Sequence, residues 1–435
     1  MDLAKTCYSW AKDLPVVDWH NHLDVAALAA DAPLGSLYEV WVKTDPYKHR
    51  AMRICGEPER VITGDAPEAE KWAAWTRTLP KLVGNPLFDW AKAELALVGI
   101  FNAEKQSGGE AGWIRGLVNV SLADWTPSKI LRQVNAEVLC PCVEPSALSS
   151  FGPAGALSGE AALGREAPLI VPSLRLSAGE EVPLETLERF DAAGCRVADI
   201  SVDDAAMLAG DDAPPLRDNQ FRVAAFAASR NWTMLLHLGA LRETSSRLRA
   251  IAGPAGGYAA MRAPVDPVAV AQFLNALEST PNPFVAEHPY DHKNSASLRL
   301  CVKNTTCLPR TILLTLNPEA HAQLAVLSGS FTREGSPGHV QLGPAWWWCD
   351  HAHGVRDVLE KSAAYGVLST FVGMTTDSRS ILSLARHDWF RRVFCRWVAE
   401  KVAVGDFPDD EALLKPLVEA VCYRNAKRLF SSLTA

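Results

Sequence analysis

The 435-residue chain lacks any run of 18 or more apolar residues, so it predicts no membrane-spanning helix. Its first ten residues also contain no apolar run long enough for a signal peptide. Lysine and arginine number 43 against 50 aspartates and glutamates, which gives a formal net charge of −7. Because no basic cluster stands out either, binding to nucleic acid or to an anionic membrane is not expected.

The ten cysteines include no CxxC pair and show no disulfide-like spacing. In a chain of this size such a pattern indicates reduced, mostly buried thiols, and we expect a cytoplasmic protein. Cys140 and Cys142 alternate along one predicted strand. We assign both of them a structural role.

What the sequence does contain is an alternation of short apolar strands with helical segments, which is typical of βα units around a parallel sheet. Eight such units favour a distorted (β/α)8 TIM barrel, which needs about 250 residues. We expect residues 1–35 to hold the first strand, residues 36–130 an α-helical insertion, and residues 131–435 the rest of the barrel and C-terminal helices. The predicted strands are Leu14–His20, Glu137–Cys142, Leu169–Leu174, Arg196–Val202, Thr233–Leu238, Thr311–Leu316, His339–Gly343 and Leu368–Met374.

Three connections stand out by length or composition. Residues 146–164 and 253–264 are rich in Ala, Gly and Ser and predict flexible surface connections or active-site loops. Residues 281–309 form an unusually long connection, in which Phe284–Glu287 could be a further strand.

Metal-ligand residues follow the first and the last predicted strands. His20 and His22 are two apart at a strand end, so both side chains share one face, which Asp18 also shares. Asp377 lies just beyond the last strand, where a carboxylate can bind a metal, move a proton, or merely cap a helix. In a closed barrel the three would meet at a divalent ion, and we expect Zn²⁺. A second pair, His351 and His353, is more simply explained as a solvated loop.

Other polar residues end strands at the same mouth. His237 ends the fifth strand and is either a buried core histidine or a catalytic group that binds metal weakly or contacts substrate. Arg175, Arg242 and Arg379 indicate an anionic substrate, since a guanidinium grips a carboxylate through two hydrogen bonds, although each alone could form a surface ion pair. Trp347, within a run of three tryptophans, either stacks on a sugar ring or packs.

Beyond these single residues, long motifs of the chain resemble the uronate isomerases, from about Val16 to Phe430. The motifs that carry the resemblance are Val42–Arg53, Gly64–Asp65, Asn85–Leu87, His237–Arg242, Leu316–Pro318, Ala345–Trp347 with Asp350, Phe371–Ser380 and Cys422–Lys427.

The resemblance implies an amidohydrolase-superfamily barrel that interconverts an aldo-hexuronate and a keto-hexuronate, either glucuronate with fructuronate or galacturonate with tagaturonate. It implies a metal held by His20, His22 and Asp377, and a catalytic Tyr47 that enters from the helical insertion. It also implies that Arg175 and Arg379 contact the substrate, and we add Asp350 to the substrate-binding group. A phenol would be a plausible proton shuttle only if the site lowers its pKa.

The chain departs from the family pattern at three places. Pro46 stands where the family usually has a histidine, and Val143 and Ala259 stand where it usually has acidic residues. Polar groups in residues 287–292 could replace a lost group, or they could form an exposed loop. Besides a uronate isomerase, two alternatives are a related hydrolase acting on another sugar acid or lactone, and a uronate-binding protein without turnover. The expected partner is a small hexuronate, in a homo-oligomer.

Overall fold

A computed structural model describes residues 2–101, 112–117, 120–151, 168–176, 180–204, 208, 214–285 and 306–433. Its main element is a curled parallel sheet in the order β1-β2-β4-β5-β6-β9-β10, with β3 paired beside β2. The strands are β1 (Val16–Asn21), β2 (Ala136–Val143), β3 (Leu169–Ile170), β4 (Ser173–Leu176), β5 (Val197–Val202), β6 (Thr233–Leu238), β9 (Arg310–Thr315) and β10 (Val340–Leu342), and a separate hairpin pairs β7 (Ala240–Leu241) with β8 (Ala260–Met261).

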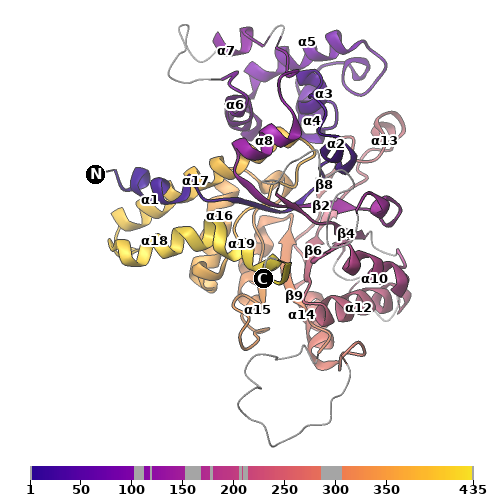
Figure 1. Cartoon of the computed structure of the whole chain (residues 1–435), viewed down its shortest axis with the longest axis vertical. Helices are drawn as coiled ribbons and strands as arrows, with labels where there is room; N and C mark the ends of the chain where they lie inside the picture. The colour runs from indigo at the N-terminus through magenta and orange to yellow at the C-terminus, as the bar shows by residue number, and fades with distance from the viewer. Residues whose placement is uncertain are drawn as a thin grey trace, which may run out of the picture.

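Helices surround this sheet, and those that follow β1 lie together above it in Figure 1. None of the helices in the described ranges is long and apolar enough to cross a membrane. The α-helices are α1 (Leu3–Ala11), α2 (Val25–Ala30), α3 (Leu37–Trp41), α4 (Pro46–Ile54), α5 (Glu68–Thr78), α6 (Pro86–Leu97), α7 (Gly112–Arg115), α8 (Pro127–Gln133), α10 (Leu184–Ala192), α12 (Pro214–Ser229), α13 (Ser246–Ala252), α14 (Pro267–Ser279), α15 (His321–Ser328), α16 (Ala352–Tyr365), α17 (Arg386–Ala403), α18 (Glu411–Glu419) and α19 (Asn425–Lys427).

The strands form where the sequence predicts them because their residues are apolar on both faces. Every residue of β1, β5 and β6 is buried, as expected of a parallel sheet that is covered by helices on one side and packed against itself on the other. The third predicted strand is divided into β3 and β4. Pro172 lies in the gap between them, and a proline cannot donate a ladder hydrogen bond.

The eighth predicted strand, Leu368–Met374, is wrong. It begins as a 3-10 turn over Leu368–Thr370, and the rest belongs to no ladder. Gly373 takes a positive φ of 79°, and a Cβ there would overlap the carbonyl oxygen of Val421. Packing against the C-terminal region therefore imposes a backbone that a regular strand cannot adopt.

The barrel still closes between this segment and β1, through side-chain contacts and isolated backbone hydrogen bonds. The amide of Asp377 donates to the carbonyl oxygen of His20 at 3.1 Å, and that of His22 donates to Ser378 at 2.8 Å. The carboxylate of Asp18 accepts from the amide of Thr376 at 2.7 Å. The distorted (β/α)8 barrel that the sequence predicts is therefore confirmed, with an irregular final segment in place of its last strand.

Two helical contacts place the insertion and the chain ends. Helix α6 packs against the 3-10 turn Ile381–Ala385, just after the closing segment, and Ser383 donates to Glu94 at 2.6 Å. Near the N-terminus, α1 packs on α17 and α18, as Figure 1 shows. The insertion is thus docked directly beside the segment that closes the barrel.

Of the three notable connections, residues 254–259 line the cavity described below, as an active-site loop would. Residues 145–150 form a 3-10 turn, and residues 152–167 lie outside the described part. In the long connection, residues 283–285 form a turn and not a strand, while residues 286–305, including the polar residues 287–292, lie outside it as well.

Candidate active site

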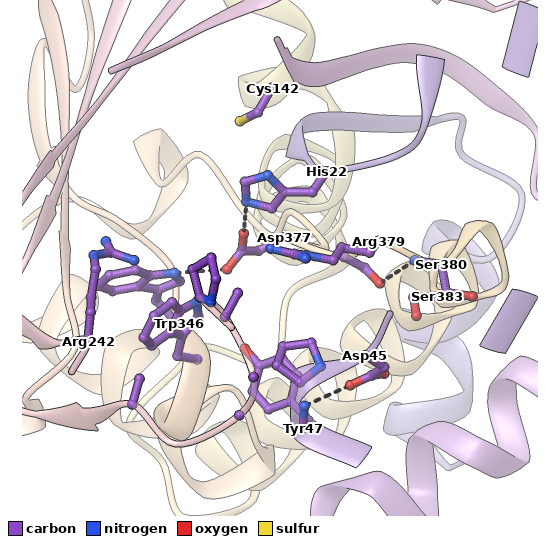
Figure 2. Close-up of a pocket in the computed structure, with 18 of the residues that line it drawn as sticks. His22, Asp45, Tyr47, Cys142, Arg242, Trp346, Asp377, Arg379, Ser380 and Ser383 are labelled. Carbon is purple, nitrogen blue, oxygen red and sulfur yellow. Dashed lines mark hydrogen bonds and ion pairs between the residues drawn. The ribbon is translucent and has the colours of Figure 1, made fainter. Parts of the chain in front are cut away.

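A cavity of about 450 Å³ opens where the carboxyl ends of the strands meet the helical insertion. Side chains from the barrel, from the insertion and from residues 254–259 form its wall, several of them drawn in Figure 2. Functional groups of βα barrels gather at this end. Nine of the predicted site residues line the cavity: His20, His22, Tyr47, Arg175, His237, Arg242, Trp347, Asp377 and Arg379.

Asp377 lies between His20 of β1 and His22, which directly follows that strand. Its Oδ1 is 3.1 Å from Nε2 of His20 and 3.0 Å from Nε2 of His22, and its Oδ2 accepts from Nε1 of Trp346 at 2.9 Å. Burial opposes ionisation, but the hydrogen bonds and charges of the two histidines outweigh it and hold the pKa of Asp377 well below its usual range. The carboxylate is therefore ionised at neutral pH, and Figure 2 shows it pointing toward His22.

His20 is a buried imidazole surrounded by acidic groups. Burial alone would lower its pKa, but the charges of Cys142 and Asp199 and the hydrogen bond to Asp377 outweigh that effect and raise the pKa to about 10. A proton held this firmly by surrounding anions marks a position where a divalent cation would also be held, since a metal takes the place of the proton on a histidine nitrogen.

His237 lies beside His20, with the ring centroids 4.8 Å apart. Its Nδ1 is 2.6 Å from Oδ1 of Asp199, while its Nε2 is buried and has no hydrogen-bond partner in the described structure. Burial lowers the pKa of His237 to about 4, so its ring is neutral above that pH. The Nε2 lone pair is then available to a metal or to a substrate proton.

These donors fit a divalent metal. His20, Asp199 and His237 each offer a ligand atom within 4.8 Å of the others, and so do His20, His22 and Cys142. Imidazole nitrogen and carboxylate oxygen suit zinc and the neighbouring first-row metals. The orphaned Nε2 of His237 is a further sign that the buried polar cluster is completed by a bound group.

The three predicted arginines differ in their partners. Arg175 forms a buried ion pair with Asp199 and donates to Ser201 at 2.6 Å. Arg242 donates to Asp203 at 3.0 Å and to the same Ser201 at 2.9 Å. Arg379 has no hydrogen bond or ion pair with any residue in the described ranges. Of the three, Arg379 is the guanidinium whose donors remain available to a ligand.

Helix α4 brings Tyr47 to the cavity as the sequence predicts. Asp45 caps the helix by accepting from the amides of Tyr47 and Lys48, and Pro46 occupies the first helical turn, where a missing N–H costs nothing. Burial, followed by the charge of Asp377, raises the pKa of Tyr47 well above 10. The lowered pKa required for a phenolate shuttle is therefore absent, and the phenol keeps its proton at neutral pH.

The three tryptophans divide their roles. Trp346 donates to Asp377, as described above, and Trp348 packs edge-on against Tyr47 at 5.2 Å between centroids. Trp347 faces the cavity with the guanidinium of Arg242 5.3 Å from its ring centroid. All three tryptophans line the cavity, and Trp347 and Trp348 are both partly exposed.

Asp350 does not line the cavity. It is 7 % exposed and forms an ion pair with the buried Arg386, which does line it. The guanidinium of Arg386 also donates to the carbonyl oxygen of Thr376 at 2.9 Å. The position of Asp350 thus fits support of the wall better than contact with a substrate. His351 likewise has a local role, because it caps α16 by accepting from Gly354.

Sequence reasoning missed two residues that organise the site. Asp199 is fully buried and contacts Arg175, His237 and Cys142. A charged residue within the apolar run Val197–Val202 was the signal that could have revealed it. The structural role assigned to Cys140 fits its place in the apolar core, whereas Cys142 lines the cavity beside His20 and Asp199.

The comparisons with known proteins all indicate the same family. A family model described as glucuronate isomerase matches residues 1–151 and 288–430. Curated uronate isomerases from Shouchella clausii and Caldicellulosiruptor bescii are 33 % and 31 % identical, over 98 % of this chain in each case and 95 % and 96 % of the relatives. The crystal structure of a uronate isomerase from Thermotoga maritima aligns with a TM-score of 0.79 and 25 % identity, over 98 % of this chain and 97 % of the other.

Proposed function

The chain belongs to the uronate isomerase family, and from that premise we propose that it interconverts an aldo-hexuronate and a keto-hexuronate. The observation that supports this most directly is the juxtaposition of Arg379 with Asp377 in one cavity. A cation with available donors and an ionised carboxylate two residues apart can hold an acidic sugar while a proton is moved. The family matches do not favour the hydrolytic or the non-catalytic alternative.

The isomerisation moves one hydrogen between C2 and C1 through an enediolate. Arg379 would bind the remote carboxylate through paired charge-assisted hydrogen bonds, and Arg175 and Arg242 line the same cavity. Holding the far end of the sugar fixes the reacting carbons relative to the catalytic groups, which contributes to catalysis by orientation. Trp347 lines the cavity and would contact the sugar with its ring.

We assign the proton transfers to three side chains that differ in their protonation states. Asp377 is ionised and can accept a hydroxyl proton, while the raised pKa of Tyr47 keeps its phenol as a donor to a developing oxyanion. His237 presents a neutral, unpaired Nε2 that can accept a hydrogen bond from a substrate hydroxyl. We propose these three as the catalytic groups.

His20, His22 and Asp377 would hold a divalent metal, for which we propose Zn²⁺. When bound, such an ion supplies positive charge that stabilises an oxyanion on the substrate. The side chain of Trp346 would orient Asp377 through its hydrogen bond to Oδ2. A homo-oligomer in the cytoplasm remains our prediction for the assembly and its location.

The function is tested by incubating metal-replete protein with D-glucuronate and D-galacturonate in D₂O and following the reaction by NMR. Formation of the ketouronate, or entry of deuterium at C2, is the expected result and also reports which sugar fits. The matched control is the same protein with the neutral hexoses, which lack the carboxylate. No change with either uronate, with bound metal verified, would refute the proposal.

A further inference from the structure

Cys142 lies at the carboxyl end of β2, against β1, which carries His20 and is directly followed by His22. The ladder pairs Asn21 of β1 with Pro141 of β2, which sets Cys142 beside the end of β1. Its Sγ is 3.4 Å from Nδ1 of His20 and 3.3 Å from Oδ2 of Asp199. Figure 2 shows the side chain together with His22 at one end of the cavity.

The spacing of these side chains is compatible with a shared metal ion. Ligand atoms of His20, His22 and Cys142 all lie within 4.8 Å of one another. Bonds of about 2.0–2.3 Å from a tetrahedral zinc place the ligand atoms roughly 3.5 Å apart, so small side-chain rotations bring these three to that distance. A cysteine in the core has no such neighbours, and Cys140, two residues earlier, lies in an apolar cluster instead.

We propose that Cys142 is a ligand of the active-site metal, bound through its sulfur alongside His20 and His22, whose ligand atoms lie close enough to share an ion with it. The inference rests on the proposed metal site of the isomerase and extends it by one residue. On binding, the S–H bond breaks, the proton passes to solvent and a sulfur–metal bond forms, with no oxidation or reduction. A thiolate is a softer ligand than carboxylate, so it favours zinc over manganese and magnesium.

The experiment replaces the metal with Co²⁺ and records the electronic spectrum. Wild-type protein should show a near-ultraviolet thiolate-to-cobalt charge-transfer band, and Cys142→Ala should lack it. Cys140→Ala is the matched control, because it removes a neighbouring thiol of the same strand that faces the apolar core, and it should keep the band. Cys142→Ala should also bind zinc at least 10-fold more weakly, since even residues that only orient a ligand cost about 10–100-fold.

X-ray absorption of the zinc-loaded wild-type protein gives an answer that does not depend on a variant that folds. One sulfur scatterer at about 2.3 Å is expected. A first shell of nitrogen and oxygen alone, with no charge-transfer band from bound cobalt, would overturn the inference and reduce Cys142 to a hydrogen-bond partner of His20. That result would leave isomerase activity on uronates intact. A wild-type chain that binds neither metal would overturn both this inference and the proposed metal site.

Discussion

Asp350 lies behind the wall of the cavity and forms a buried ion pair with Arg386, which is part of that wall. Through Arg386 the pair also reaches the carbonyl oxygen of Thr376, the residue before Asp377. The irregular segment that closes the barrel is therefore held by a charge pair from two elements outside it. This relationship gives Asp350 a structural importance that its sequence motif does not reveal.

Replacing Asp350 by Ala should destabilise the fold. Removing one partner of a buried pair leaves the other charge uncompensated, which costs about 3–5 kcal/mol. Urea unfolding monitored by tryptophan fluorescence measures the loss, and Asp350→Asn, which keeps a hydrogen-bond acceptor, should lose less. Unchanged stability together with a higher KM for uronates alone would instead mean that Asp350 contacts the substrate.

Gly257 connects the cavity loop to the helix that carries Tyr47. It has a φ of 83°, and a Cβ at this position would overlap the carbonyl oxygen of Pro46. Gly257→Ala should push the start of α4 away and lower kcat/KM by about 10- to 100-fold, because an error of about 1 Å in position can cost a factor of this size.

The control for Gly257 is Gly253→Ala in the same loop. Gly253 also has a positive φ, 68°, but a Cβ there meets nothing within 4 Å. Both variants carry backbone strain, whereas only Gly257→Ala has the collision with Pro46. Steady-state kinetics that show equal losses in the two would assign the effect to strain and not to the placement of Tyr47.

Acid should destabilise the protein partly through His339. Burial, then the charges of Arg333 and Arg310, lowers the pKa of His339 to about 3, below the usual 6.5. Between these values the unfolded chain binds the extra proton, so stability falls as the pH falls. From pH 7 to pH 5 this one histidine should remove about 2 kcal/mol from the free energy of unfolding.

His339→Gln tests the assignment, since it should flatten the pH dependence by that amount. Urea unfolding at pH 7 and pH 5 provides the measurement, and His353→Gln, at an exposed position, is the control that should retain the wild-type dependence. A slope that does not differ between wild type and His339→Gln would contradict a neutral buried His339.

Most strands could be predicted because local sequence determines them. Thr233–Leu238 is predicted and found with identical bounds. A short apolar run of this kind is typical of a strand that is buried on both faces of a parallel sheet. The prediction of the eighth strand failed because contacts with distant parts of the chain determine the backbone conformation of this segment. Gly373 and Asp377 both adopt positive φ to fit the C-terminal region and β1, and no local pattern records that demand.

The site residues likewise divide into those that local sequence predicts and those that depend on distant contacts. His20, His22 and Asp377 could be expected together because strand ends of a closed barrel converge, and the structure brings them within hydrogen-bond distance. The partners of the arginines could not be predicted. Asp199 and Arg175 lie on different strands, and a lone carboxylate in an apolar run does not indicate which residue it will contact. A single cysteine such as Cys142 is in most proteins a core residue.

Arg379→Met should weaken binding of carboxylate sugars selectively. Hydrogen bonds to charged groups contribute about 1.5–3 kcal/mol, so the Kd for a hexuronate should rise by about 10- to 100-fold. Calorimetry with a uronate and with the matching neutral hexose measures the difference. Arg249→Met is the control, because Arg249 lines the same cavity but is paired with Glu243 at 3.4 Å. Equal weakening of both sugars by Arg379→Met would make Arg379 a structural residue.

Asp377→Asn should abolish most turnover while the fold persists. The amide keeps the size of the carboxylate but loses the charge that faces His20 and His22, and with it the capacity to accept a proton. Loss of one general base costs about 10²–10⁴-fold, and weaker metal binding would add to that. Initial rates, metal content and far-ultraviolet circular dichroism separate the two effects. Asp266→Asn is the matched control, since Asp266 caps α14, where asparagine serves equally well. Full activity of Asp377→Asn would refute its catalytic role, whereas full metal content with lost turnover would assign the carboxylate to the proton transfer itself.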